Sequence, residues 1–226
     1  MRKILFVLFL AALIIIGLNL LNISIYDYIR QDYTTLAAQD YNGIDINKVD
    51  NYRIEVEFKP VAKTCQVNQT IDYINKEDEP LTELYFHIYP NAFRSNMQPW
   101  GPLSRNNNNY EPGYIEFSSV KINGKEAVKD ILGSDQTLLR IYLSDNLPPS
   151  GRVDINLEYE LKIPHTNHRF GYTENTYNFG NWYPIASVFD HKGWNQSEYY
   201  GIGDPFYSDV SNYDISITAP KEYIIA

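Results

Sequence analysis

The sequence offers few residues for metal binding or nucleophilic catalysis, because it contains four histidines and a single cysteine in 226 residues. Two of the histidines, His165 and His168, stand three positions apart after Pro164. A zinc-protease helix needs the pattern H-E-x-x-H, in which both imidazoles share one helical face and the glutamate is the general base. The pair here has another spacing and no glutamate between its members. We therefore predict a pair of loop histidines and no metal ligands.

The remaining candidate groups point to packing. His87 lies inside an alternating run, where we expect it to pack among Tyr85 and Tyr89. We interpret Cys65 as a small hydrophobic residue at the start of a strand. The sequence contains neither a G-x-S-x-G nucleophile elbow nor a G-x-x-x-x-G-K phosphate loop, and no spacing pairs two carboxylates as a glycosidase requires. We predict no catalytic residue in this chain.

Composition excludes several classes of protein. Hydrophobic residues make up 44% of the chain, which argues against a disordered or collagen-like protein. The net charge of −9 argues against nucleic acid as a partner, since phosphate contacts need clustered lysine and arginine. Aromatic residues make up 15% and include 20 tyrosines, which favours β structure.

The N-terminus predicts a membrane anchor. Arg2 and Lys3 precede an apolar run from Ile4 to Leu21, about the length that crosses a bilayer as a helix. Since basic residues stay on the cytoplasmic side, we expect residues 1–26 to be a signal anchor in the cell membrane, single-pass, with the rest extracytoplasmic. A cleaved signal peptide is the alternative, but no A-x-A pattern follows the run. Residues 27–47 are polar and predict a tether.

From Tyr52 onward the hydrophobic pattern has period two, which is typical of half-buried strands. Turn signals separate the runs: Pro60 follows the first, Asn123-Gly124 is a strong hairpin signal, and a Pro-Pro-Ser-Gly turn stands at 148–151. No amphipathic helix is recognisable after residue 30. We predict an all-β domain with an antiparallel sandwich or barrel-like architecture. The alternating runs lie at 52–58, 67–73, 84–89, 115–122, 139–143, 153–161 and 213–217.

Two long irregular stretches, 93–113 and 164–209, interrupt this pattern. The second contains two of the three tryptophans. In a compact β domain, loops of this length usually carry function or cover an edge.

One segment resembles a known family. Residues 84–93, L-Y-F-H-I-Y-P-N-A-F, are similar to the L-Y-F-H-x-Y-P-N-A-F segment of bacterial members of the aminopeptidase N-like (membrane alanyl aminopeptidase) family of zinc metallopeptidases. Other pieces similar to the family follow in the same order, so the resemblance covers residues 48–226. These pieces are 113–115, 120–124, 159–164, 169–171, 181–184, 188–190, 193–194, 203–208 and 213–220.

The resemblance implies an antiparallel β-sandwich or saddle-like N-terminal aminopeptidase domain at 48–226, preceded by one transmembrane helix. In the family, such a domain precedes a thermolysin-like catalytic domain that holds the zinc on H-E-x-x-H. That motif is absent from this sequence. The expected role is therefore non-catalytic, with no cofactor in this chain and zinc in the catalytic domain. The expected partners are an own or separate zinc-peptidase domain, the N-terminus of a peptide substrate, and the membrane.

The resemblance also implies one substrate-binding residue. In the family, a glutamine or glutamate of the N-terminal domain reaches the catalytic cleft and helps to hold the free α-amine of the substrate. The matching stretch here is 172–178, where Glu174 is the only glutamate or glutamine. A carboxylate suits an ammonium group as a charge-assisted hydrogen-bond partner. A solvated loop carboxylate without such a role is the alternative.

Two other functions stay open at the level of sequence. An anchored β-sandwich could be a binding module for glycans or proteins, using loops rich in tyrosine. The chain could also be a remnant without function, in which case an exposed apolar patch is expected where a second domain would dock. Its length matches about one domain after the anchor, which is too short for the enzyme that it resembles.

Overall fold

The structure is a computed structural model that describes residues 48–94, 111–200 and 206–226. The chain divides into two compact units, Met1–Asp45 and Ile46–Ala226, and the described residues all belong to the second. The signal anchor and tether predicted for residues 1–47 therefore lie outside the described residues.

None of the helices formed by residues 48–94, 111–200 and 206–226 is long and apolar enough to cross a membrane.

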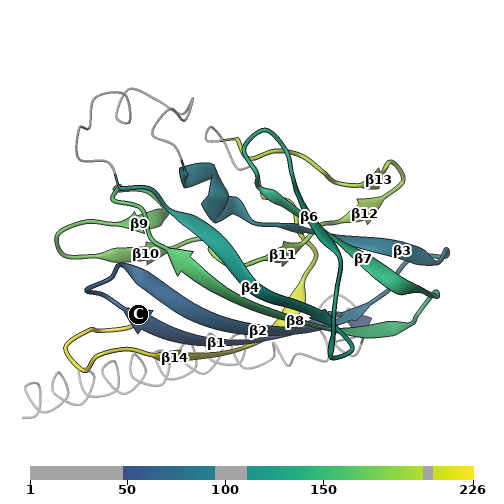
Figure 1. Cartoon of the computed structure of the whole chain (residues 1–226), viewed down its shortest axis with the longest axis horizontal. Coiled ribbons are helices and arrows are strands. Elements are labelled where there is room, and N and C mark those ends of the chain that lie inside the picture. The colour runs from purple at the N-terminus through teal and green to yellow at the C-terminus, as the bar shows by residue number, and fades with distance from the viewer. Residues whose placement is uncertain (1–47, 95–110, 201–205) are drawn as a thin grey trace, which may run out of the picture. The chain divides into compact units, whose positions relative to one another are not determined.

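The described residues form fourteen β-strands and one short 3₁₀ helix, η3, so the predicted all-β class is confirmed (Figure 1). The elements are β1 (Asp50–Lys59), β2 (Thr64–Ile74), β3 (Leu81–His87), η3 (Tyr89–Phe93), β4 (Tyr114–Ile122), β5 (Lys125–Glu126), β6 (Lys129–Leu132), β7 (Leu138–Leu147), β8 (Arg152–Lys162), β9 (Phe170–Tyr172), β10 (Tyr177–Phe179), β11 (Ile185–Ala186), β12 (Phe189–Asp190), β13 (Gly193–Trp194) and β14 (Ser211–Thr218).

Two larger sheets organise the domain. The six-stranded sheet has the order β14-β1-β2-β8-β4-β5, and the four-stranded sheet has the order β11-β3-β7-β6. Strands β9 and β10 form one small hairpin, and β12 and β13 form another. Among the described strands every pairing is antiparallel except that of β1 with β14, which is parallel. The large sheet is thus mixed, which corrects the prediction of a purely antiparallel sheet at that one edge.

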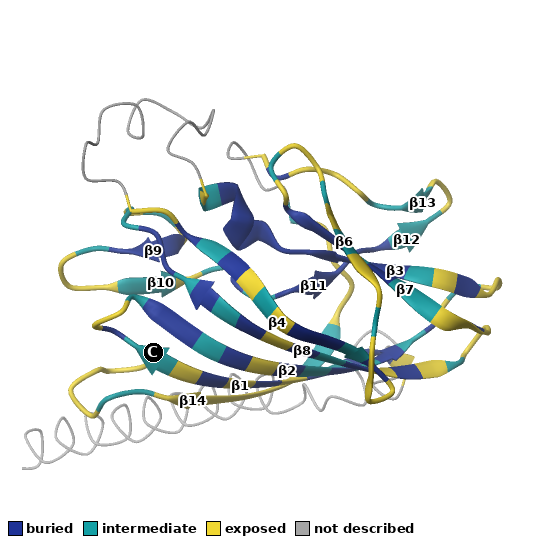
Figure 2. Cartoon of the chain, viewed as in Figure 1, coloured by how far each residue is buried: buried dark blue, intermediate teal, exposed yellow. Residues whose placement is uncertain are grey.

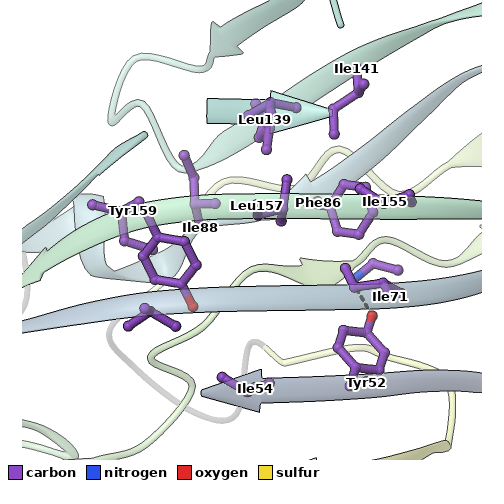
Figure 3. Packing of buried hydrophobic residues seen from close by; sticks show 14 of the residues in the cluster. Tyr52, Ile54, Ile71, Phe86, Ile88, Leu139, Ile141, Ile155, Leu157 and Tyr159 are labelled. Atoms are coloured by element: carbon purple, nitrogen blue, oxygen red, sulfur yellow. Dashed lines mark hydrogen bonds between the residues drawn. The ribbon is translucent and has the colours of Figure 1, made fainter. Parts of the chain in front are cut away.

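The two larger sheets pack face to face around one core. Period two places Ile54 of β1, Ile71 of β2 and Leu157 of β8 on the same face, and all three are fully buried. Phe86 and the neighbouring apolar residues of β3 and β7 cover that face from the second sheet (Figure 3). Since each buried aliphatic or aromatic side chain contributes about 1.5–3 kcal/mol, this core is the main source of stability.

The long stretch after β8 buries the second face of β3. Trp194 packs on Tyr85 with ring centroids 5.6 Å apart, and Tyr199 packs on Tyr89 at the same separation. Strand β11 also adds to the edge of β3, pairing Ile185 with His87. Most of β3 is therefore buried on both faces, as its dark colour shows (Figure 2). This stretch covers an edge and a face, which is one of the two roles predicted for it.

Turn chemistry fixes the β4–β5 hairpin where the sequence predicted it. Asn123 and Gly124 both have positive φ, 50° and 76°, as a type I′ turn requires. Nothing lies within 4 Å of a side chain built on Gly124, so glycine is needed there for its backbone conformation and not for space.

Candidate functional site

The histidines do not assemble into a site. His165 stacks on Tyr172 with ring centroids 4.9 Å apart, while His168 lies beside Phe93 at 5.6 Å. Burial lowers the pKa of His168, with a smaller contribution from Arg169. These contacts match the predicted loop pair. Within the described ranges, no group of three or more histidine, cysteine, aspartate or glutamate side chains could hold a metal ion. The residues present thus do not fit zinc, and no metal chemistry follows for them.

His87 is buried and stacks on Tyr89, with ring centroids 4.9 Å apart and planes only 5° from parallel. Neither of its ring nitrogens has a hydrogen-bond partner among the described residues. Burial therefore lowers the pKa of His87 to about 4. A neutral imidazole packed in this way is a core residue, as the sequence predicted.

Cys65 is fully buried on the core face of β2. Burial raises the pKa of its thiol to about 12, which keeps it protonated and unreactive at neutral pH. The interpretation of Cys65 as a small hydrophobic residue agrees with this position.

Glu174 lies at the exposed tip of the β9–β10 hairpin. The tip is closed by Thr173, whose backbone N–H donates to the carbonyl of Thr176 at 2.9 Å. At the last residue pair before the tip, Lys63 donates to the Tyr177 hydroxyl at 2.6 Å and lies over the Tyr172 ring at 4.8 Å from its centroid. The hairpin is thus tied to the β1–β2 turn close to its tip. Glu174 is exposed there, so a ligand outside the domain could reach its carboxylate.

The main anomaly of the domain lies at the open edge of the large sheet. Tyr213, Ile215 and Ile217 of β14 are 42–45% exposed, and we call these three residues the β14 apolar row. In the parallel register they stand directly beside Tyr52, Ile54 and Val56 of β1, which are buried in the core. Partners in register point to the same face of a sheet. The core face therefore continues one strand beyond the layer that covers it.

A series of aromatic rings links this row to the core. Tyr213 stacks on Tyr52 with centroids 5.0 Å apart and also contacts Tyr183 at 5.8 Å. Tyr183 meets Trp182 edge to face at 5.4 Å, and Trp182 is buried. Trp182 and Tyr183 are thus packing residues of this series. Near the end of β1, Phe58 contacts Tyr223 edge to face at 5.4 Å, so aromatic contacts occur near both ends of this strand.

An ion triad fixes the start of β14. The Asp50 carboxylate is buried and accepts a hydrogen bond from the backbone N–H of Ile74 at 3.0 Å. Lys76 lies 3.0 Å from Asp50 and 3.0 Å from Asp209, which precedes β14. Burial raises the pKa of Asp50, and the nearby Lys76 opposes that rise. The edge strand is thus attached to the sheet by charge as well as by backbone hydrogen bonds.

The opposite, polar face of the large sheet carries a shallow open hollow of about 460 Å³. Three glutamates line it, Glu55, Glu57 and Glu158, and no lysine or arginine of the described part of the chain does. Ser216 and Thr218 of β14 belong to its lining. Two half-buried lysines balance part of the charge from outside the hollow, because Lys59 lies 3.2 Å from Glu57 and Lys121 lies 3.9 Å from Glu158.

Sequence reasoning found the alternation in β14 but missed its exposure. A run such as Tyr213-Asp214-Ile215 predicts that one face is apolar, yet it does not say whether another layer covers that face. The ion triad was missed as well, since Asp50, Lys76 and Asp209 are far apart in the chain. An ion triad built from distant segments of the chain leaves no local pattern in the sequence.

The described residues therefore define a two-layer, all-β domain in which one apolar edge is left uncovered by the parts described. No family profile matches the chain, and no curated protein matches it.

Among solved structures, the chain is similar to the N-terminal portion of M1 zinc metallopeptidases. A mutant of the enzyme from Deinococcus radiodurans is 14% identical, with a TM-score of 0.35, and the match covers 51% of this chain and 20% of that chain. The same enzyme bound to a Tyr-Ser-Ala substrate is 14% identical, with a TM-score of 0.33 and the same coverage. A two-domain M1 zinc metallopeptidase mutant bound to L-arginine is 12% identical, with a TM-score of 0.37, and the match covers 65% of this chain and 27% of that chain. The chain thus spans about a fifth to a quarter of the length of these proteins.

Proposed function

We propose that residues 48–226 are a non-catalytic β domain that docks a zinc-aminopeptidase domain, with residues 1–26 holding it at the outer side of the cell membrane. The β14 apolar row carries this proposal. A core face that runs uncovered onto the edge strand is expected of a domain that completes its packing with a partner. We infer that the partner is a zinc-aminopeptidase domain because segments 84–93 and 181–184 resemble that family.

In this assembly the β domain forms one wall of the peptide-binding cleft. Glu174, exposed at its hairpin tip, would accept a hydrogen bond from the α-ammonium group of the substrate. Catalysis would belong to the partner, whose bound zinc would supply Lewis-acid activation of the scissile carbonyl and of a water. The described residues of this chain supply binding and position only.

A photo-cross-linking amino acid at position 215 tests the proposal in cells that naturally express the protein. We expect a cross-link to a polypeptide segment that contains H-E-x-x-H or belongs to the domain carrying it. The same amino acid at Val128, which is 70% exposed and lies outside β14, is the matched control and should not capture that segment. Capture of no peptidase segment at position 215, or equal capture at both positions, would contradict the proposal.

A glycan-binding module is the second candidate. Its support is that Phe179, Tyr213 and Tyr223 are each more than a third exposed, and exposed rings can stack on sugars. Two of these rings already make close aromatic contacts, Tyr213 with Tyr52 and Tyr223 with Phe58. Binding of the full chain to a glycan array, lost on Tyr213→Ala, would favour this function over docking.

A further inference from the structure

The outer side of β14 is a sheet edge to which no described strand is added. Among the described residues β14 pairs with β1 alone, along eight register positions from Ser211 to Thr218. From Tyr213 to Thr218 every residue is exposed. A terminal strand directs half of its backbone N–H and C=O groups away from its neighbour, where they can pair with an added strand.

Natural sheets usually protect such an edge with a proline, a lysine, a bulge or a covering segment. The other end of the same sheet shows these devices: β4 has an irregular register between Phe117 and Ser119, carries Lys121, and is partly covered by β5. Strand β14 has neither lysine nor proline among its eight residues, and its register with β1 is unbroken. Compared with the β4 end of the sheet, the β14 edge therefore lacks the features that prevent a further strand from pairing with it.

The two faces beside this edge set the side chains of an added strand. Alternate residues of that strand would lie beside the β14 apolar row and extend the core face. The residues between them would lie beside Ser216 and Thr218, at the rim of the acidic hollow. Glu55 lines that hollow without a cation within 4 Å among the described residues, and its carboxylate accepts a hydrogen bond from the Asn68 amide at 3.5 Å. Charge complementarity therefore favours lysine or arginine at those positions.

We propose that the β14 edge binds an extended segment of the partner domain as a seventh strand, and that this segment alternates β-branched or aromatic residues with lysine or arginine. The inference rests on the proposed function for the identity of the partner. It adds the mode of docking, which is strand addition with backbone hydrogen bonds along the edge. The apolar residues supply affinity on the core face, while the cations fix which face of the added strand turns to the hollow.

The probe is a synthetic eight-residue peptide of alternating lysine and valine, matched to the length of β14. Its binding to the full chain in a neutral detergent is measured by fluorescence anisotropy, with detergent alone as the blank. We expect binding that weakens as salt is added. Ile215→Asp should weaken it by about tenfold or more, because the apolar contact is lost at the centre of the row. Val128→Asp is the matched control and should leave the affinity unchanged.

Two kinds of peptide variant distinguish strand addition from nonspecific binding. Both are tested with the unaltered protein. N-methylation of every second residue blocks backbone donation on one side of a strand only. We expect one of the two N-methylated registers to lose binding and the other to keep it. A peptide with glutamate in place of lysine should bind about tenfold more weakly or not at all. Equal binding of both N-methylated peptides, or of the glutamate peptide, would overturn the proposal, as would no binding of the lysine peptide.

The outcomes also separate the two proposals. If position 215 cross-links to a zinc-peptidase segment but the peptides do not bind as expected, docking stands and strand addition is wrong. If the peptides bind in one register but no peptidase segment is captured, the edge takes a strand and the partner is of another class.

Discussion

Strands β8 and β14 have the same alternating pattern but different surroundings. In β8 the apolar residues Val153 to Leu161 are all buried, and the strand lies in the middle of the large sheet. In β14 the equivalent residues Tyr213, Ile215 and Ile217 are nearly half exposed at its edge. The comparison teaches that alternation encodes which face is apolar, whereas position in the sheet decides whether that face is covered.

The largest expected difference between the two strands is in stability. Leu157→Ala removes a fully buried side chain and should lower the free energy of unfolding by about 2–5 kcal/mol. Ile215→Ala removes a half-exposed one and should cost less than about 1 kcal/mol. Chemical denaturation of the full chain, followed by tyrosine and tryptophan fluorescence, measures both. Equal losses would mean that β14 is as well packed as β8.

The pH dependence of stability provides a second, smaller difference between covered and uncovered positions. The pKa of His87 is about 4 in the folded chain against 6.5 for a free histidine. Between pH 6.5 and pH 4 the unfolded chain therefore takes up a proton that the folded chain does not. The free energy of unfolding should fall as the pH falls through this window, by about 3 kcal/mol in total.

Below about pH 4 both states carry the proton, and this contribution no longer changes. His87→Phe should reduce the slope between pH 6.5 and pH 4, whatever it does to stability at pH 7. His191→Gln is the matched control, because the His191 side chain is 81% exposed. Denaturation curves at a series of pH values measure the slope. An unchanged slope in His87→Phe would show that His87 is protonated in the folded chain.

The local pattern of hydrophobic and turn residues was sufficient to predict much of the fold. The runs at 52–58, 67–73 and 153–161 became β1, β2 and β8, with the expected residues inside. The Asn123-Gly124 turn formed as predicted, because its backbone conformation is set by the two residues themselves. The predictions for His87 and Cys65 also agree with the structure, since both side chains are buried as packing residues.

The rest depends on contacts between distant parts of the chain. The parallel pairing of β14 with β1 joins residues about 160 positions apart, and no local pattern specifies it. The short strands β9 to β13 were missed because their two or three residues are too few to show a period. The role of Glu174 stays a prediction, since an exposed carboxylate at a hairpin tip gains a role only from a bound partner.

The central claim is that the β14 apolar row is covered in the assembled protein. Cysteine labelling tests it directly, because the native Cys65 is buried with its pKa raised to about 12 and should not react. Ile215→Cys and Val128→Cys are each treated with a maleimide, first as the purified full chain and then in membranes of cells that naturally express the protein. We predict fast labelling of both in the purified chain and protection of position 215 alone in the membranes. Equally fast labelling of position 215 in both preparations would contradict the account.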